Sequence, residues 1–302
     1  MDNVLSKRQI KLEDICVLLI SFNRPDLLQN RIMELEKSIV LNIYISIDGG
    51  PKSHTQEVEK VKTLASRVLK NHKLNLQHHK HNLGMVLHET GEISKVLGMH
   101  KYAIIIEDDI KISENFISNM ILGLNKLEEL ELRGIVSGYS PLMSKKSNNK
   151  WRKTHITFVW GWAISSKNWN GYKHDLSETN IELELSKSKT WQELNRCQKN
   201  FWINKIRRVQ EYPLFTYDYQ ILFHSFINNF TNLTPVFSVI DNEGFEDSRA
   251  MHTKGAKPKN LKSFKVNNKS ISTMSRFSKL YTLFDDDNYY KKLKQRLSRI
   301  LK

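Results

Sequence analysis

The first 110 residues alternate between short apolar runs and longer segments with apolar residues at helical spacing. Four runs predict buried strands, at residues 16–22, 43–47, 74–78 and 102–106. The segments at about 27–35, 55–70 and 86–97 predict helices between them. This alternation predicts an α/β fold, with a mostly parallel sheet flanked by helices on both faces.

Polar residues follow three of these strands. Asn23 and Arg24 come after the first strand, Asp48 and Gly49 end the second, and the acidic triplet 107–109 ends the fourth. Open parallel sheets bind ligands at the carboxyl ends of their strands. We therefore expect all three groups along one edge of the sheet.

The triplet Glu107, Asp108 and Asp109 is the strongest single feature. Adjacent carboxylates repel each other, and a fold tolerates them where cations are near. Carboxylate oxygens suit Mg²⁺ or Mn²⁺, and such an ion can bridge the phosphates of a nucleotide sugar. The alternative is an acidic first turn of a helix, which needs no metal.

Two further segments of the first half are candidates for binding a nucleotide. Asp48 can accept hydrogen bonds from a ribose hydroxyl or a base N–H, although a plain turn at the strand end is equally compatible. Asn82 and Gly84 directly precede a helix, whose N-terminus attracts phosphate. The alternative there is a simple turn before the helix.

The second half supplies candidates for the acceptor side. Trp160, Gly161 and Trp162 can form a sugar-binding platform, or can be an ordinary core patch. Asp218 stands among aromatic residues at a predicted helix start, as a general base or as an N-cap. His252 is a candidate metal or diphosphate ligand, with a plain surface or core position as the alternative.

The second half is less regular than the first. Residues 144–154 predict a basic loop, and residues 235–240 a short strand. Long helices are expected between 180 and 210 and from 218 to 229. Residues 277–302 predict a basic amphipathic helix.

The net charge of +15 is unevenly distributed. Residues 254–302 carry 14 Lys and Arg against three Asp, a net of +11, which leaves +4 for the other 253 residues. Such a C-terminal extension suits an anionic membrane surface, a diphosphate lipid or a nucleic acid. We divide the chain into a domain at 1–253, with halves at about 12–140 and 141–253, and an extension at 254–302.

The apolar runs and the cysteines bear on location. The longest purely apolar runs have about six residues, whereas a membrane-spanning helix needs about 20. Cys16 and Cys197 do not make a disulfide framework. We expect a cytoplasmic protein, with the extension holding it against the inner face of the membrane.

Eight segments, taken in order, resemble bacterial GT-A-fold glycosyltransferases related to N-acetylglucosaminyltransferase I and to family 2. They are VLLISFNRPD (17–26), SIDGG (46–50), HNLG (81–84), IIIEDDI (104–110), SGYSP (137–141), FVWGWAIS (158–165), YDYQ (217–220) and NEGFEDSRAMHT (242–253). The match spans nearly the whole chain. It is specific for the fold and the family, and much less so for the donor or the acceptor.

The resemblance implies roles for the matched positions. The nucleoside pocket is implied to be lined by Phe22, Asn23, Arg24 and Asp48. The residues implied to lie near the ribose are Glu107 and Asp108. Asp109 is implied to bind the metal, and Asp218 to deprotonate the acceptor hydroxyl in an inverting displacement. Trp160, Gly161 and Trp162 are implied to help form the acceptor side.

We therefore expect a Mn²⁺- or Mg²⁺-dependent glycosyltransferase. Its donor is expected to be a nucleotide sugar, with a UDP-sugar favoured. Its acceptor is expected to be a growing glycan on a lipid carrier, and the resemblance implies a place in the synthesis of surface polysaccharide or lipopolysaccharide. One alternative is a sugar nucleotidyltransferase, which usually carries a glycine-rich loop that FNRPD lacks. The other is a basic protein that binds a nucleic acid or a membrane surface without catalysis, but no nucleic-acid-binding module is recognisable.

Overall fold

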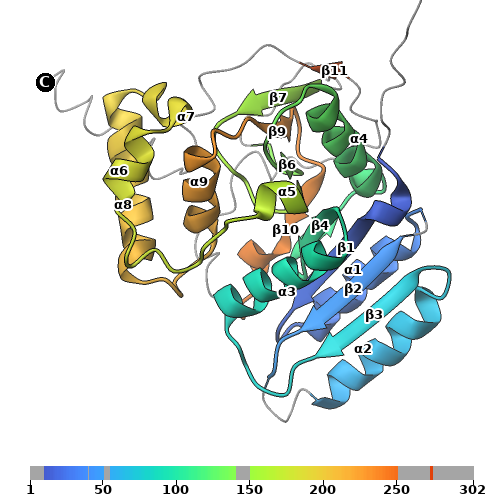
Figure 1. The fold of residues 1–302 in the computed structure, drawn as a ribbon. Coiled ribbons are helices and arrows are strands. Elements are labelled where there is room, and N and C mark those ends of the chain that lie inside the picture. The colour runs from blue at the N-terminus through green and yellow to red at the C-terminus, as the bar shows by residue number, and fades with distance from the viewer. Residues whose placement is uncertain (1–9, 40, 51–54, 141–149, 251–272, 275–302) are drawn as a thin grey trace, which may run out of the picture.

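The computed structural model describes residues 10–39, 41–50, 55–140, 150–250 and 273–274. Within these residues, nine strands form one mixed sheet in the order β11-β7-β9-β6-β8-β4-β1-β2-β3 (Figure 1). The strands of this sheet are β1 (Ile15–Ser21), β2 (Asn42–Ile47), β3 (Lys73–His78), β4 (Tyr102–Glu107), β6 (Val136–Ser137), β7 (Lys150–Thr154), β8 (Trp162–Ser165), β9 (Asn232–Pro235) and β11 (Thr273–Met274). A separate antiparallel pair joins β5 (Ile110–Ile112) and β10 (Ile240–Asn242).

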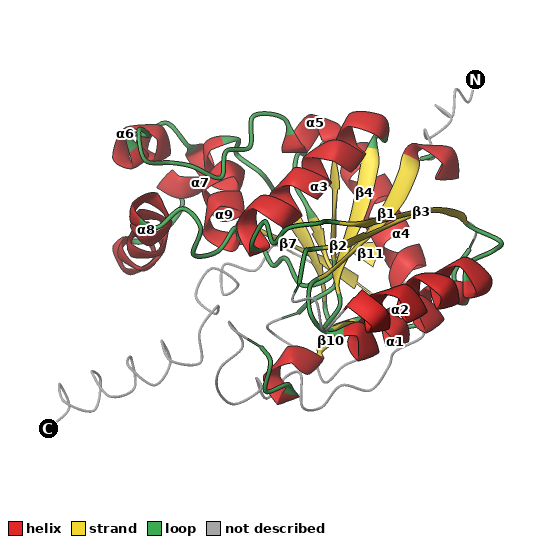
Figure 2. Cartoon of the chain, turned by 90° about the horizontal axis from the view of Figure 1, so that it is seen from below, coloured by secondary structure: helices red, strands yellow, loops and turns green. Residues whose placement is uncertain are grey.

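The first four strands run parallel to one another, with β1 between β2 and β4. All seven residues of β1 are buried, because alternate side chains enter two different cores. Val17 and Leu19 pack in the core covered by α1 (Pro25–Glu36) and α2 (Thr55–Val68). Leu18 and Ile20 pack in the core covered by α3 (Met85–Met99). The expected class, an α/β fold with a mostly parallel sheet between helices, is confirmed (Figure 2).

The second half of the chain continues the same sheet in mixed directions. β8 runs antiparallel to both β4 and β6. The helices α4 (Phe116–Glu129) and α5 (Ser166–Trp169) contribute to opposite faces of the sheet. Figure 1 shows four further helices grouped at the side away from β3: α6 (Ile181–Ser186), α7 (Lys189–Gln192), α8 (Arg196–Glu211) and α9 (Asp218–Ile227).

Two expectations for the second half were wrong in detail. Residues 150–154 form β7, not a loop, because Trp151 is buried against α4 and the strand pairs with β9. The single strand expected at 235–240 is two strands, β9 and β10. Residues 236–239 between them are not in a strand, because the chain leaves β9 of the main sheet and pairs β10 with β5 in a separate one.

The helical region expected between residues 180 and 210 consists of three helices. They are α6 (Ile181–Ser186), α7 (Lys189–Gln192) and α8 (Arg196–Glu211). Each begins at its own N-cap, because the side chains of Asn180, Ser188 and Asn195 accept bonds from backbone N–H groups three residues on. Three cap residues within 16 positions are the signal for separate helices. The helix expected at 218–229 is α9 (Asp218–Ile227).

Two remaining features complete the description. Short 3₁₀ helices occur at η1 (Leu12–Asp14) and η3 (Glu243–Glu246). The helix expected at 277–302 lies outside the described residues, as does nearly all of the basic extension. Among the helices of the described ranges, none is long and apolar enough to cross a membrane.

Candidate active site

A cavity of about 270 Å³ lies at the carboxyl ends of β1, β2 and β4. It is the edge of the sheet to which the carboxyl-end rule assigns a ligand. Eleven residues singled out from the sequence line it: Phe22, Asn23, Arg24, Asp48, Asn82, Gly84, Glu107, Asp108, Asp109, Trp160 and Asp218. Residues from 22 to 218 therefore meet at one place, although they are spread over most of the domain.

Two other candidates, Gly161 and Trp162, do not line this cavity. Trp162 is fully buried in β8, inside the core under α3 and α5. Gly161 packs against Phe116 and Ile240, and its carbonyl accepts the Gly138 N–H at 2.6 Å. Of the expected aromatic platform, only Trp160 reaches the cavity, because Gly161 has a left-handed backbone (φ 56°) that turns the chain between Trp160 and the start of β8 at Trp162. His252 lies outside the described residues.

Asp48 fastens the loop before α3 to the end of β2. Its carboxylate accepts three backbone N–H groups, from Gly49 and Leu83 at 2.8 Å each and from Gly84 at 3.0 Å. A side chain at Gly49 would come within 2.2 Å of the His81 backbone, so the loop packs directly on this glycine. Both carboxylate oxygens of Asp48 are already engaged. Its observed contacts are therefore those of a residue that shapes the pocket.

Arg24 spans the two aspartates of the acidic triplet. Its guanidinium lies 2.5 Å from Asp108 Oδ1 and donates to Asp109 Oδ2 at 2.8 Å. The Ser21 hydroxyl donates to Asp108 Oδ2 at 2.7 Å. Burial raises the pKa of Asp108 to about 6, against the opposing effect of the Arg24 charge. The triplet is thus held by a cation from the end of β1.

One oxygen of the triplet suits a metal ion. Asp109 Oδ1 is buried and has no hydrogen-bond partner, while its other oxygen bonds Arg24. No cluster of three or more His, Cys, Asp or Glu side chains in the described ranges is arranged to hold a metal. Mg²⁺ commonly binds through one or two carboxylates and completes its shell with substrate phosphates and water. Asp109 fits this manner of binding, in which the substrate supplies further ligands. The described residues do not offer a metal site made of protein ligands alone.

Glu107, the first residue of the triplet, is close to another buried carboxyl group, that of Glu89. The Tyr217 hydroxyl donates to Glu107 Oε1 at 2.9 Å. Glu89, on α3, is buried nearby, and its Oε2 has no hydrogen-bond partner. Burial, and then the charge of Glu107, raises the pKa of Glu89 well above its usual value. Burial likewise raises the pKa of Glu107, with the charge of Asp109 adding to it.

Asp218 is the first residue of α9 and lies beside this group. Its side chain is half-buried, and desolvation raises its pKa to about 6. The expected N-cap role is not observed, because the N-cap of α9 is Tyr217. A carboxylate with such a pKa is ionised at neutral pH and can accept a proton.

The segment after β10 closes one side of the cavity. The Glu243 N–H donates to the Asp109 carbonyl at 2.8 Å. Arg249 lines the cavity and bonds both oxygens of Asp26, in the first turn of α1, at 2.7 and 2.8 Å. Arg249 therefore joins the end of this segment to α1 and adds a second guanidinium to the site.

Sequence reasoning assigned no role to Glu89 or Arg249. Glu89 lies three residues after Val86 and four before Ile93, both buried, and an acid at this spacing is a signal that could have identified it. Arg249 lies within the segment 242–253, which contributes to the family resemblance, but nothing in the sequence indicated that it contacts α1.

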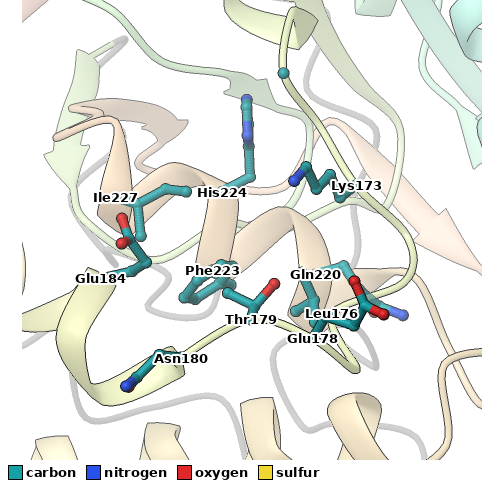
Figure 3. A pocket seen from close by; sticks show the side chains of 11 residues that line it. Lys173, Leu176, Glu178, Thr179, Asn180, Glu184, Gln220, Phe223, His224 and Ile227 are labelled. Carbon is teal, nitrogen blue, oxygen red and sulfur yellow. The ribbon is translucent and has the colours of Figure 1, made fainter.

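A second cavity, of about 320 Å³, lies against α9 (Figure 3). Phe223, His224 and Ile227 project into it from that helix, and Lys173 and Glu184 face them. Among the described residues singled out for donor, metal or acceptor, none lines it. The first cavity is the candidate active site, because it alone of the two combines carboxylates of raised pKa with arginines at the sheet edge.

Comparisons with known proteins found only distant likeness. No protein-family model matches the sequence, and no curated protein matches it. Among solved structures, a mannosyltransferase of Pyrobaculum calidifontis in complex with GDP-Man and Mn²⁺ is similar over 72% of this chain and 71% of its own, with 12% identity and a TM-score of 0.42. The glycosyltransferase GlyE in Streptococcus pneumoniae TIGR4 is similar in its apo form over 95% of this chain, with 13% identity and a TM-score of 0.38. A second GlyE structure is similar over 76%, with 13% identity and a TM-score of 0.32. The chain covers 64% and 55% of those two GlyE chains. Likeness this distant does not establish a family, so the function is inferred from the site.

Proposed function

We propose that this protein is a metal-dependent glycosyltransferase, which moves a sugar from a nucleotide-diphosphate donor to an acceptor hydroxyl. One observation carries the proposal. A single cavity lies at the carboxyl ends of the parallel strands, and in it one carboxylate oxygen of Asp109 has no hydrogen-bond partner. The same cavity contains the guanidinium groups of Arg24 and Arg249 and the Asp218 carboxylate, whose pKa is raised. Those are the groups that transfer from a diphosphate leaving group requires.

The donor is proposed to bind along the ends of β1 and β2. Phe22 and Asn23 offer an aromatic face and an amide to the nucleoside, and Asn82 and Gly84 stand at the start of α3. Guanidinium groups pair well with phosphate oxygens, so Arg24 and Arg249 favour a diphosphate. We favour a UDP-sugar on the resemblance in sequence.

Mn²⁺ or Mg²⁺ is proposed to bind through Asp109, with donor oxygens completing its shell. When bound, the ion neutralises the charge that develops on the leaving diphosphate. Arg24 already pairs with the second oxygen of Asp109 and holds the carboxylate in place. Asp108, bonded by Ser21 and Arg24, fixes the turn on which Asp109 stands.

Asp218 is the proposed general base. With a pKa of about 6 it is mostly ionised at pH 7 and accepts the proton of the acceptor hydroxyl as the new bond forms. A direct displacement assisted by one base inverts the configuration of the transferred sugar. Trp160, held edge-on by Tyr139 and Phe245, offers an aromatic surface for the acceptor. The acceptor proposed is a glycan of surface polysaccharide or lipopolysaccharide.

Calorimetric titration tests the proposal. UDP, GDP, CDP and dTDP are titrated into the full chain with and without Mn²⁺, and into Asp109→Asn. The matched control is Asp175→Asn, which changes an exposed aspartate that lines neither cavity. We expect one nucleotide to bind in a metal-dependent way, at least about tenfold more weakly to Asp109→Asn and unchanged with the control. Absence of nucleotide binding under every condition, or equal binding by Asp109→Asn, would contradict the proposal.

A further inference from the structure

One buried histidine lines the candidate active site without a role in the proposed reaction. His88 is the fourth residue of α3, lines the cavity, and is 2% exposed. Its Nε2 atom lies 2.8 Å from the hydroxyl of Ser46, a buried residue of β2. Within the described residues, no hydrogen bond is made by Nδ1 of His88. A polar ring this buried, with one nitrogen unpaired, is suited to a partner that enters the cavity.

The contacts of Ser46 decide which nitrogen of His88 carries the hydrogen. The Ser46 oxygen also lies 3.4 Å from His79 Nε2, and that nitrogen lies 3.2 Å from Glu92 Oε1. A carboxylate only accepts, so His79 Nε2 carries a hydrogen and cannot accept the one of Ser46. The amide nitrogen of Gln77 favours neither ring nitrogen of His79, at 3.4 and 3.3 Å. The Ser46 hydroxyl therefore donates to His88 Nε2, which leaves the hydrogen of His88 on Nδ1.

His88 has a single N–H group at neutral pH. Burial lowers the pKa of its imidazole to about 4, against the opposing effect of the Asp48 charge. The neutral ring accepts from Ser46 at Nε2 and can only donate at Nδ1. A fixed donor of this kind selects an acceptor on a ligand and disfavours a second donor.

His88 lies at the end of the cavity away from Asp109. β1 separates β2 from β4, which places the ends of β2 and β4 about 10 Å apart. Ser46 stands two residues before Asp48, about 7 Å further from the carboxyl edge of the sheet. His88 is therefore at the inner end of the cavity. A diphosphate held at Arg24 and Asp109 directs the opposite end of the nucleotide, which is its base, toward His88.

We propose that the Nδ1–H group of His88 donates to a carbonyl oxygen on the outer edge of the donor's base, O4 of uracil or O6 of guanine. Cytosine and adenine carry an amino group at that position, which places a second donor opposite His88. The cavity therefore selects a nucleotide whose base has a carbonyl there. Ser46 is a positioning residue, because it fixes the hydrogen of His88 on Nδ1. This inference rests on the proposed nucleotide-sugar donor.

Calorimetric titration of the full chain with Mn²⁺ measures the selectivity. UDP is compared with CDP, and GDP with ADP, for wild type, His88→Leu, Ser46→Ala and Thr90→Ala. Thr90 is a matched control because it is buried on α3, its hydroxyl donates to the Val86 carbonyl at 2.7 Å, and it does not line the cavity. The pair of nucleotides that binds identifies the base as a pyrimidine or a purine.

We expect wild type and Thr90→Ala to bind the carbonyl member of that pair at least about tenfold more tightly than the amino member. His88→Leu should bring the ratio of the two dissociation constants close to one, because the donor is lost. Ser46→Ala should do the same while keeping the imidazole, because the ring can then carry its hydrogen on either nitrogen.

Three outcomes overturn the inference. They are a wild type that prefers CDP or ADP, a ratio unchanged in both His88→Leu and Ser46→Ala, and a ratio lost equally in Thr90→Ala. Each of them leaves the proposed transfer reaction standing, since wild type still binds a nucleotide. Absence of nucleotide binding by wild type contradicts both.

Nitrogen NMR of histidine-labelled protein checks the position of the hydrogen without any nucleotide. The signals of His88 are those that disappear in His88→Leu. We expect them to show a protonated Nδ1 and an unprotonated Nε2 in wild type, and a mixture of the two forms in Ser46→Ala. A protonated Nε2 in wild type would overturn the inference, because Nδ1 would then be an acceptor.

Discussion

Removal of the Asp48 carboxylate tests whether this residue holds the pocket together. Asp48 lies at the end of β2, is 2% exposed, and accepts N–H groups of Gly49, Leu83 and Gly84. In Asp48→Asn the remaining oxygen can still accept from Gly49 and Leu83. The new amide instead points a donor at the Gly84 N–H, which keeps only its bond to Asn82 at 2.7 Å.

The expected loss of stability follows from these contacts. One hydrogen bond to a charged acceptor contributes about 2 kcal/mol, so Asp48→Asn should lower the free energy of unfolding by about that amount. Asp48→Ala removes all three bonds and should cost about 4 kcal/mol, since the bonds share one carboxylate and are not fully additive.

Urea unfolding measures both variants, with Asp175→Asn as a control at an exposed aspartate. The slopes against urea concentration should match wild type, so that the shifts in midpoint report stability. If both Asp48 variants stay within about 0.5 kcal/mol of wild type, the carboxylate does not hold the loop. A loss of nucleotide binding without a loss of stability would instead indicate that Asp48 contacts the ribose directly.

The remaining predictions concern Asp218 and two glycines. Because the pKa of Asp218 is raised to about 6, kcat for transfer should fall about tenfold per pH unit below 6 and level off above it, whereas a flat profile from pH 5 to 8 would exclude it as the base. Its folded-state pKa lies above the unfolded value, so the ionised group destabilises the fold above pH 6. Asp218→Asn should therefore lose transfer yet melt at a higher temperature than wild type at pH 8, with the gain fading below pH 4. Gly98→Ala should raise the free energy of unfolding by up to about 1 kcal/mol, because an added Cβ meets nothing within 4 Å in α3. Gly123→Ala in α4 should instead lower it, since its Cβ would come 2.4 Å from Val136 Cγ1; equal stability of the two variants would contradict the packing described.

The parallel half of the fold was predictable, because its signals are local. The buried runs of β1, β2 and β4 and the amphipathic helices between them appear at the expected places, with shifts of at most two residues at their ends. The second half was less predictable for a physical reason. The sequence of β7 predicts a basic loop. Only the structure shows that Trp151 packs against α4, because this contact joins residues far apart in the chain.

The candidate site was predictable in position more than in contacts. Strand ends carry polar residues to one edge of the sheet, and so the sequence pointed to Arg24, Asp109 and the turn between β4 and β5. Which atoms meet there was not predictable. The engagement of Asp48 by the loop before α3, and the bond of Arg249 to Asp26, depend on segments 35 and 223 residues apart.

The sequence by itself determined the alternation of strands and helices and, through it, the edge at which a ligand can bind. These follow from hydrophobic periodicity, which each segment carries alone. Only the tertiary structure decided that Trp162 belongs to the core, that Glu89 joins the acidic group, and that Arg24 pairs with Asp109. Burial and charge pairing are properties of the assembled neighbourhood, because the pKa and the partners of a side chain depend on groups that the folded chain brings to it.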